Sequence, residues 1–194
     1  MCQLALNCKE GACVVAQTQT QGYGRQSRKW ESPEGGLYFS FVLKPDKILP
    51  HLPYALCWAL LEVLEAELHH ELQMKAPNDI LFQQKKLAGL LIDAKIQGTQ
   101  ALYYVCGAGV NVNQINHTFA LQSTAISMRQ VSGKPFKINE ILTAVLQSFS
   151  AKYQLLLLDQ FEPAILAHFK KREIQIGYNN PTQMRFEEYW NANK

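Results

Sequence analysis

The chain has 194 residues and a formal net charge of +3 at pH 7, with 47% hydrophobic and 18% charged residues. This composition predicts one globular domain with a hydrophobic core, or one such domain with a short appendage. The small charge does not indicate a nucleic-acid or anionic-membrane binder. No apolar stretch reaches the roughly 18 residues that cross a bilayer, and no signal-peptide pattern opens the chain. We therefore expect no DNA and no membrane partner.

The five cysteines are odd in number and form no C-x-x-C pair. This spacing suits neither a disulfide framework nor a zinc site, so reduced thiols in a cytoplasmic protein are expected. The residues are Cys2, Cys8, Cys13, Cys57 and Cys106.

The first half of the chain predicts two strands and a long helix. Residues 12–17 form a short apolar run and predict a buried strand. Residues 37–43 are rich in aromatic side chains and predict a second strand, which Pro45 ends. Leucines recur at helical spacing across residues 51–72, opposite Glu62, Glu65 and Glu71, and predict an amphipathic helix.

The second half predicts three more strands followed by two helices. Residues 80–82 and 87–96 predict a hairpin, although its turn lacks Gly or Asn. A third strand is expected over 103–112, and helices over 138–158 and 160–171. Because strands and helices are interspersed without strict alternation, we expect an α+β fold with a mixed β-sheet and helices packed on one face.

A loop rich in glycine and cations lies between the first two predicted strands. Its glycines allow positive φ and a close approach to a ligand, and Trp30 adds a flat aromatic surface. Such a loop can close over a phosphate-bearing substrate. Taken alone, it could equally be an exposed basic turn or a contact for a nucleic-acid backbone. The residues concerned are Gly22, Gly24, Arg25, Arg28, Lys29, Gly35 and Gly36.

Two further segments carry polar residues at strand ends. Pro77-Asn78-Asp79 is turn chemistry on its own, and Lys85-Lys86 is compatible with a plain hairpin tip. Residues 107–113, G-A-G-V-N-V-N, begin like a dinucleotide-binding fingerprint. They lack its third glycine and no helix start follows, so a Rossmann site is rejected.

In register, these segments resemble biotin–protein ligases. Residues 22–40 are similar to that family's loop G-R-G-R-x-x-R-x-W-x-S-P-x-G-G-L-Y-x-S. Residues 75–92 are similar to its K-W-P-N-D-I and K-x-A-G-I-L elements, and 107–113 to its G-x-G-x-N-x-N element. The resemblance implies a class II synthetase-like catalytic domain over residues 1–170, with 171–194 as a short C-terminal tail that replaces most of the family's SH3-like domain.

The resemblance also implies a reaction in two steps. Biotin and ATP, with Mg²⁺ on the phosphates, would give biotinyl-5′-AMP, and the biotinyl group would pass to a lysine of a biotin carboxyl carrier protein. The first step brings two anions together, a repulsion of about 4 kcal/mol at ~4 Å and an effective dielectric near 20. Arg25 and Lys86 would offset it, and Asp79 would orient the acceptor ammonium.

The implied sites are as follows. Biotin would contact Gln19, Gly22, Tyr23, Gly24, Arg25, Gly35, Gly36, Lys86 and Gly89. ATP would contact Arg25, Arg28, Trp30, Asn78, Lys86 and Asn111, and no protein ligand is assigned to a metal.

The sequence also departs from the family pattern. Tyr23 replaces the first arginine of the loop, Ala76 replaces a tryptophan, and Met1 follows the position of a Ser-Thr-Asn segment. A lipoate ligase or octanoyltransferase shares the fold, but this chain has no R-R-x-S-G-G-G-A-V loop. A non-catalytic biotin- or adenylate-binding protein is the other alternative. A DNA-binding helix-turn-helix is not expected, and the chain would act as a monomer or homodimer.

Overall fold

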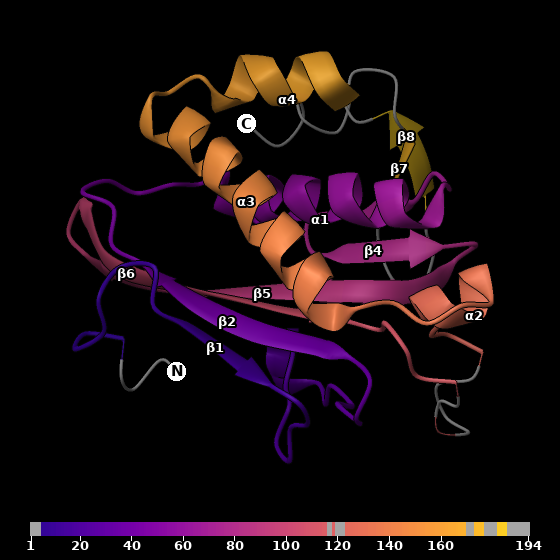
Figure 1. The fold of residues 1–194 in the computed structure, drawn as a ribbon. Coiled ribbons are helices and arrows are strands. Elements are labelled where there is room, and N and C mark those ends of the chain that lie inside the picture. The colour runs from indigo at the N-terminus through magenta and orange to yellow at the C-terminus, as the bar shows by residue number, and fades with distance from the viewer. Residues whose placement is uncertain (1–4, 116–117, 119–122, 170–172, 177–181, 186–194) are drawn as a thin grey trace.

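The computed structural model describes residues 5–115, 118, 123–169, 173–176 and 182–185. Over these residues the chain forms an eight-stranded sheet in the order β1-β2-β6-β5-β4-β3-β7-β8. Neighbouring strands are antiparallel, except that β3 and β7 are parallel. Helices α1, α3 and α4 lie over one face of this sheet (Figure 1). The predicted α+β fold, with a mixed sheet and helices on one face, is confirmed.

The elements have these bounds. The strands are β1 (Cys13–Ala16), β2 (Leu37–Leu43), β3 (Gln73–Lys75), β4 (Asp79–Phe82), β5 (Lys85–Gln97), β6 (Gln100–Val110), β7 (Glu173–Ile176) and β8 (Thr182–Arg185). The helices are α1 (Leu52–Leu68), α2 (Met128–Ser132), α3 (Ile138–Leu157) and α4 (Phe161–Phe169), and one 3₁₀ turn, η2, spans Arg25–Ser27.

Two expectations about the first half need correction. The β1 strand is not buried, because Val14 is 55% and Val15 47% exposed. It lies at the edge of the sheet and pairs with β2 alone, a position that a run of apolar residues does not reveal. The α1 helix stops at Leu68 rather than at residue 72, since His69 adopts a left-handed φ of 56° and caps it.

The hairpin between β4 and β5 is as predicted, despite its unusual turn. Gln83 and Gln84 both have positive φ, 49° and 67°, which is the conformation of a type I′ turn. The turn therefore forms here with two glutamines in place of the Asn-Gly pair that favours it.

Apart from the 3₁₀ turn η2, four elements of the described residues were not predicted from the sequence. The helix α2 begins with a capping box between Ser127 and Gln130, an S-x-x-Q pattern visible in the sequence. The strand β3 is only three residues long. Strands β7 and β8 fall within residues 171–194 and extend the sheet through β3. The domain boundary at residue 170 remains a prediction.

The helix-covered face of the sheet carries the core. Directly opposed residues on neighbouring strands line up in one row across five strands, and all of them are 0% exposed. We call this set the buried row: Leu37, Val110, Ala88, Ile80 and Met74. Because successive strand residues point to opposite faces, the next row along the strands faces away from the helices. Within the described residues, no helix is long and apolar enough to cross a membrane.

Candidate active site

A second row of opposed residues crosses the open face of the sheet one position further along the strands. We call it the site row. It runs from β2 through β6, β5 and β4 to β3 and comprises Tyr38, Gly109, Gly89, Asp79 and Lys75. The row has a tyrosine at one end, two glycines in the middle and a charged pair at the other end.

Gly89 and Gly109 have no side chains, so Trp30 of the glycine-rich loop can lie directly against the strand backbone. A Cβ atom at Gly109 would stand 2.6 Å from the Trp30 ring. One at Gly89 would stand 2.9 Å from Cε of Lys86 and 3.0 Å from the same ring. Any other residue would therefore force Trp30 or Lys86 to move. These glycines permit a close approach of side chains rather than an unusual φ.

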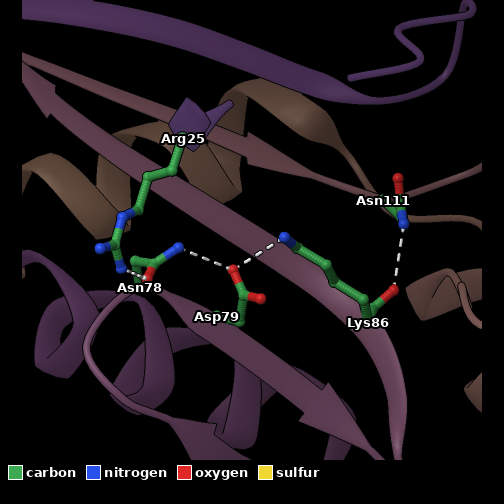
Figure 2. Close-up of polar contacts among 5 residues, drawn as sticks. All are labelled: Arg25, Asn78, Asp79, Lys86 and Asn111. Carbon is green, nitrogen blue, oxygen red and sulfur yellow. Dashed lines mark hydrogen bonds and ion pairs between the residues drawn. The ribbon is translucent and has the colours of Figure 1, made fainter. Parts of the chain in front are cut away.

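Four polar side chains form a continuous chain beside this floor (Figure 2). The Arg25 guanidinium donates to Asn78 Oδ1 at 2.8 Å, and Asn78 Nδ2 donates to Asp79 Oδ1 at 3.0 Å. The Lys86 ammonium lies 2.7 Å from the same Asp79 oxygen. The Asp79 side chain is 2% exposed, whereas that of Lys86 is 32% exposed. Two cations from distant parts of the chain thus converge on one Asn-Asp pair.

The position of Lys86 is fixed by its backbone as well as by its side chain. Its N–H donates to the Thr124 carbonyl at 2.7 Å. Its carbonyl accepts from the Ile126 N–H at 3.0 Å and from the Asn111 side-chain amide at 3.2 Å (Figure 2). The ammonium lies 5.0 Å from the centre of a Trp30 ring, within cation–π range.

Residues 19–32, the first part of the loop, fold back on themselves, with antiparallel bridges from Gln19 to Ser32 and from Tyr23 to Lys29. The Ser32 hydroxyl donates to Gln19 Oε1 at 2.7 Å, and the Trp30 N–H donates to the Gly22 carbonyl at 2.9 Å. A Cβ at Gly22 would be 2.5 Å from the Trp30 carbonyl oxygen, so only glycine allows this pairing. These contacts hold Gln19 and Trp30 where both line the cavity.

The end of the loop is tied to the segment after β6. The Tyr38 hydroxyl donates to the Pro33 carbonyl at 2.8 Å and accepts from Gln114 Nε2 at 2.9 Å. Burial raises the pKa of Tyr38 to about 12, against the opposing effect of the Gln114 hydrogen bond, so the hydroxyl is neutral near pH 7. Gly36 leaves room for this hydroxyl, and Gly35 has a φ of +93°. Sequence reasoning missed Gln114.

Most of the predicted site residues line one cavity of about 820 Å³. Asp79 is not among the residues that line the cavity, but it contacts two that are, Asn78 and Lys86. Gly35 and Gly36 lie against residues 113–114 instead of lining the cavity wall. Apolar side chains that line the cavity and share the face of the site row include Leu91 and Val105. The predicted residues that line the cavity are Gln19, Gly22, Tyr23, Gly24, Arg25, Arg28, Trp30, Asn78, Lys86, Gly89 and Asn111.

The described residues include no group of three or more His, Cys, Asp or Glu side chains that could hold a metal ion. What the site offers instead is cationic. A deep cavity floored by strand backbone and bordered by Arg25, Arg28 and Lys86 can hold an anionic ligand whose other end is apolar.

These features define an α+β domain whose open sheet face carries a cavity with cationic side chains beside a glycine-rich loop. A family model described as the biotin/lipoate A/B protein ligase family matches residues 4–111. The chain belongs to this family.

Named relatives agree with this assignment. The chain is 34% identical over 179 residues to the bifunctional ligase/repressor BirA of Bacillus spizizenii, covering 89% of this chain and 55% of that protein. It is 27% identical over 160 residues to biotin–protein ligase 2 of Arabidopsis thaliana, covering 78% and 48%. The chain thus spans about half the length of these two relatives.

A solved structure shares the fold over nearly the whole chain. The biotin protein ligase from Aquifex aeolicus in complex with biotin and ATP superposes with a TM-score of 0.77 at 30% identity. The match covers 92% of this chain and 78% of that one.

Proposed function

We propose that this chain uses ATP to activate biotin as biotinyl-5′-AMP and then transfers the biotinyl group to a lysine of a biotin carboxyl carrier protein. One observation carries the proposal: Arg25 and Lys86, 61 positions apart, border one cavity and meet on the Asn78–Asp79 pair. The similar proteins named above are ligases, and the solved one is described with biotin and ATP.

In the first step, a carboxylate oxygen of biotin attacks the α-phosphorus of ATP, and the bond from that phosphorus to the bridging oxygen of pyrophosphate breaks. Both reactants are anions. Arg25 and Lys86 are placed to hold them together and to stabilise the charge that builds up on the phosphate. Trp30 covers Lys86 and limits its contact with water, which strengthens these interactions.

The apolar ring system of biotin needs an apolar pocket with a few polar groups. Leu91 and Val105 supply apolar wall, and the Gln19–Ser32 pair supplies polar atoms. Tyr23 stands where the family has an arginine; it lines the cavity and is 58% exposed. The loop would therefore offer the ligand one cation fewer than the family's loop does.

In the second step, the acceptor amine attacks the biotinyl carbonyl carbon and AMP leaves. A free lysine has a pKa near 10.4 and arrives as an ammonium. We propose that Asp79 orients that ammonium and accepts its proton, which gives the neutral amine that attacks. In support, the Asp79 carboxylate already binds one ammonium, that of Lys86.

Replacing Asp79 with asparagine separates the two steps. We expect Asp79→Asn to spare pyrophosphate release from ATP and biotin and to slow transfer to the carrier by about tenfold or more, the loss of one charged hydrogen bond. Single-turnover assays of each step provide the measurement. An equal loss in both steps would remove this role from Asp79.

Mg²⁺ belongs to the proposal as a companion of ATP, because phosphate oxygens are ligands that it prefers. We also propose that the protein works in the cytoplasm, since Cys57 and Cys106 are buried as free thiols.

The direct test incubates the purified chain with Mg–ATP, biotin and a biotin carboxyl carrier domain. We expect pyrophosphate release that depends on biotin, followed by a mass increase of the carrier. Lipoate in place of biotin is the matched control and should give neither product. Release of pyrophosphate with lipoate but not with biotin would contradict the proposal, and tight biotin binding without turnover would favour a non-catalytic binding protein.

A further inference from the structure

Gln114 is a buried side chain of the cavity wall to which the proposed function gives no role. It is 5% exposed and lines the cavity, as does Asn111, which is 6% exposed. Its amide nitrogen donates to the Tyr38 hydroxyl at 2.9 Å and to Asn111 Oδ1 at 3.4 Å. A buried amide is unfavourable unless it is hydrogen-bonded, so these contacts define what Gln114 does.

The hydrogen bonds of Gln114 and Asn111 run in one direction. The Lys86 carbonyl can only accept, so Asn111 turns its Nδ2 toward it, at 3.2 Å (Figure 2). Asn111 Oδ1 then faces Gln114, whose nitrogen has to be the donor. Within the described residues, Gln114 Oε1 is left without a hydrogen-bond partner. The chain of donors therefore leads from Gln114 through Asn111 to the backbone of Lys86.

The backbone of Lys86 depends on such contacts because the β4–β5 ladder is irregular there. Two consecutive residues of β4 pair with Ala88 and Lys86, so that Leu87 is skipped. Irregular pairing of this kind changes the direction in which a side chain points. The Lys86 N–H and carbonyl bond to the backbone of residues 124–126, and the carbonyl also accepts from Asn111. Residues that follow β6 thus hold Lys86 in place.

The other contacts of Gln114 lead to the loop and to the segment before α2. The Tyr38 hydroxyl that Gln114 binds donates to the Pro33 carbonyl at 2.8 Å. The Gln114 carbonyl accepts from the Ser127 hydroxyl at 2.5 Å, and Ser127 directly follows the residues that bond to Lys86. Gln114 therefore connects the end of the glycine-rich loop with the residues that hold Lys86.

We propose that Gln114 is a positioning residue of the first step, which fixes Lys86 relative to the glycine-rich loop. This inference rests on the proposed function and extends it to a side chain that does not act on the reacting atoms itself. The Lys86 ammonium and Arg25 of the loop have to hold two anions together. By binding Asn111 and Tyr38, Gln114 limits how far these two cations can move apart. A shift of about 1 Å in such a group can reduce a rate up to about a hundredfold.

A purely structural role for Gln114 makes a different prediction. If its amide only stabilises the segment after β6, its loss should have the same effect whether or not residue 86 carries an ammonium. If Gln114 acts through Lys86, its loss should matter only while that ammonium is present. A direct contact of Gln114 with the substrate would also persist without the ammonium, so it is distinguished from a positioning role.

The experiment is a double-mutant cycle in the full chain with Gln114→Met and Lys86→Met. Methionine keeps an unbranched side chain and removes the amide. The control is Asn113→Ala, because Asn113 carries the neighbouring amide and bonds to the Phe136 backbone through both Nδ2 and Oδ1, each at 2.8 Å. Three quantities are measured: kcat and KM for the formation of biotinyl-5′-AMP, and the melting temperature.

For Gln114→Met we expect kcat of adenylate formation to fall about tenfold to a hundredfold with little change in KM, as for a misplaced catalytic group. In the Lys86→Met background the same substitution should cause no further loss. Asn113→Ala should lower the melting temperature and keep kcat close to that of the wild type.

An equal loss from Gln114→Met in both backgrounds, or a wild-type kcat in Gln114→Met alone, would overturn the positioning role. If Gln114→Met does not fold, Tyr38→Phe takes its place in the cycle with the same expected pattern, because it removes only the hydroxyl to which Gln114 donates. If the wild type itself forms no biotinyl-5′-AMP, the proposed function fails instead, so the two failures are distinct.

Discussion

The buried row and the site row lie one residue apart on the same strands, yet the first belongs to the hydrophobic core and the second to the candidate site. Ile80, Ala88 and Val110 are 0% exposed beneath the helices. Their neighbours lie on the open face: Gly89 and Gly109 form the surface against which Trp30 packs, and Asp79 lies toward the charged end of the site row. Because successive side chains of a strand point to opposite faces, a residue that stabilises the core is followed by one that faces the candidate site. Substitutions in each row should therefore change different measurements.

The largest effect should come from Lys86→Met, on the cavity side. Removing this cation should leave the carboxylate and phosphate repulsion of about 4 kcal/mol uncompensated. We expect adenylate formation to fall about a thousandfold. The melting temperature should also fall, because the Asp79 carboxylate, which is 2% exposed, loses the ammonium that balances its charge. Pyrophosphate release and thermal unfolding test this pair of outcomes, and retained adenylate formation would contradict the assignment of Lys86.

The next effect should appear in the buried row, with Ile80→Ala. The substitution opens a cavity under the helices and should lower the free energy of unfolding by about 2–5 kcal/mol. Urea denaturation measures this loss. Activity per folded molecule should stay close to that of the wild type at low temperature. A variant of normal stability with lost activity would show that the two rows are not separable here.

The smallest effect should come from Gly109→Ala, in the site row. The new Cβ would stand 2.6 Å from the Trp30 ring and push it off the floor. Because misplacement by about 1 Å can reduce rates up to a hundredfold, we expect a tenfold to hundredfold loss of kcat/KM for ATP.

Gly107→Ala is the control for this prediction. It lies on the same face of β6, and its Cβ would be 3.2 Å from the Ser40 hydroxyl rather than against Trp30. Equal losses for ATP in Gly107→Ala and Gly109→Ala would count against the Trp30 contact as the cause.

The fold class and many of the residues that line the cavity could be predicted from the sequence, but the two rows could not. Residue patterns predict β2, β5 and β6, the loop motif predicts Arg25 and Trp30 at the site, and the K-x-A-G element predicts Gly89 there. The rows depend on strand register, which is set by pairing between distant residues. Lys75 was missed for this reason: β3 has three residues and too little periodicity to be predicted, so nothing set Lys75 opposite Asp79.

The error at β1 has a related cause. A run of apolar residues predicts a strand, but it does not say whether other elements will cover that strand. Val14 and Val15 are exposed because β1 is at the sheet edge, and edge position is a property of the topology. Gln114 was missed because its role arises from a hydrogen bond to Tyr38, 76 positions away.

The parallel pairing of β3 with β7 has a consequence for how the molecule folds. Met74 and Ile174 are opposed although 100 positions separate them, so this ladder closes a very long loop of chain. Closing such a loop costs more conformational entropy than forming the β4–β5 hairpin, whose ends are joined by two residues. We expect the hairpin to assemble early and β7 to dock late, with the amide protons of β7 exchanging faster than those of β5.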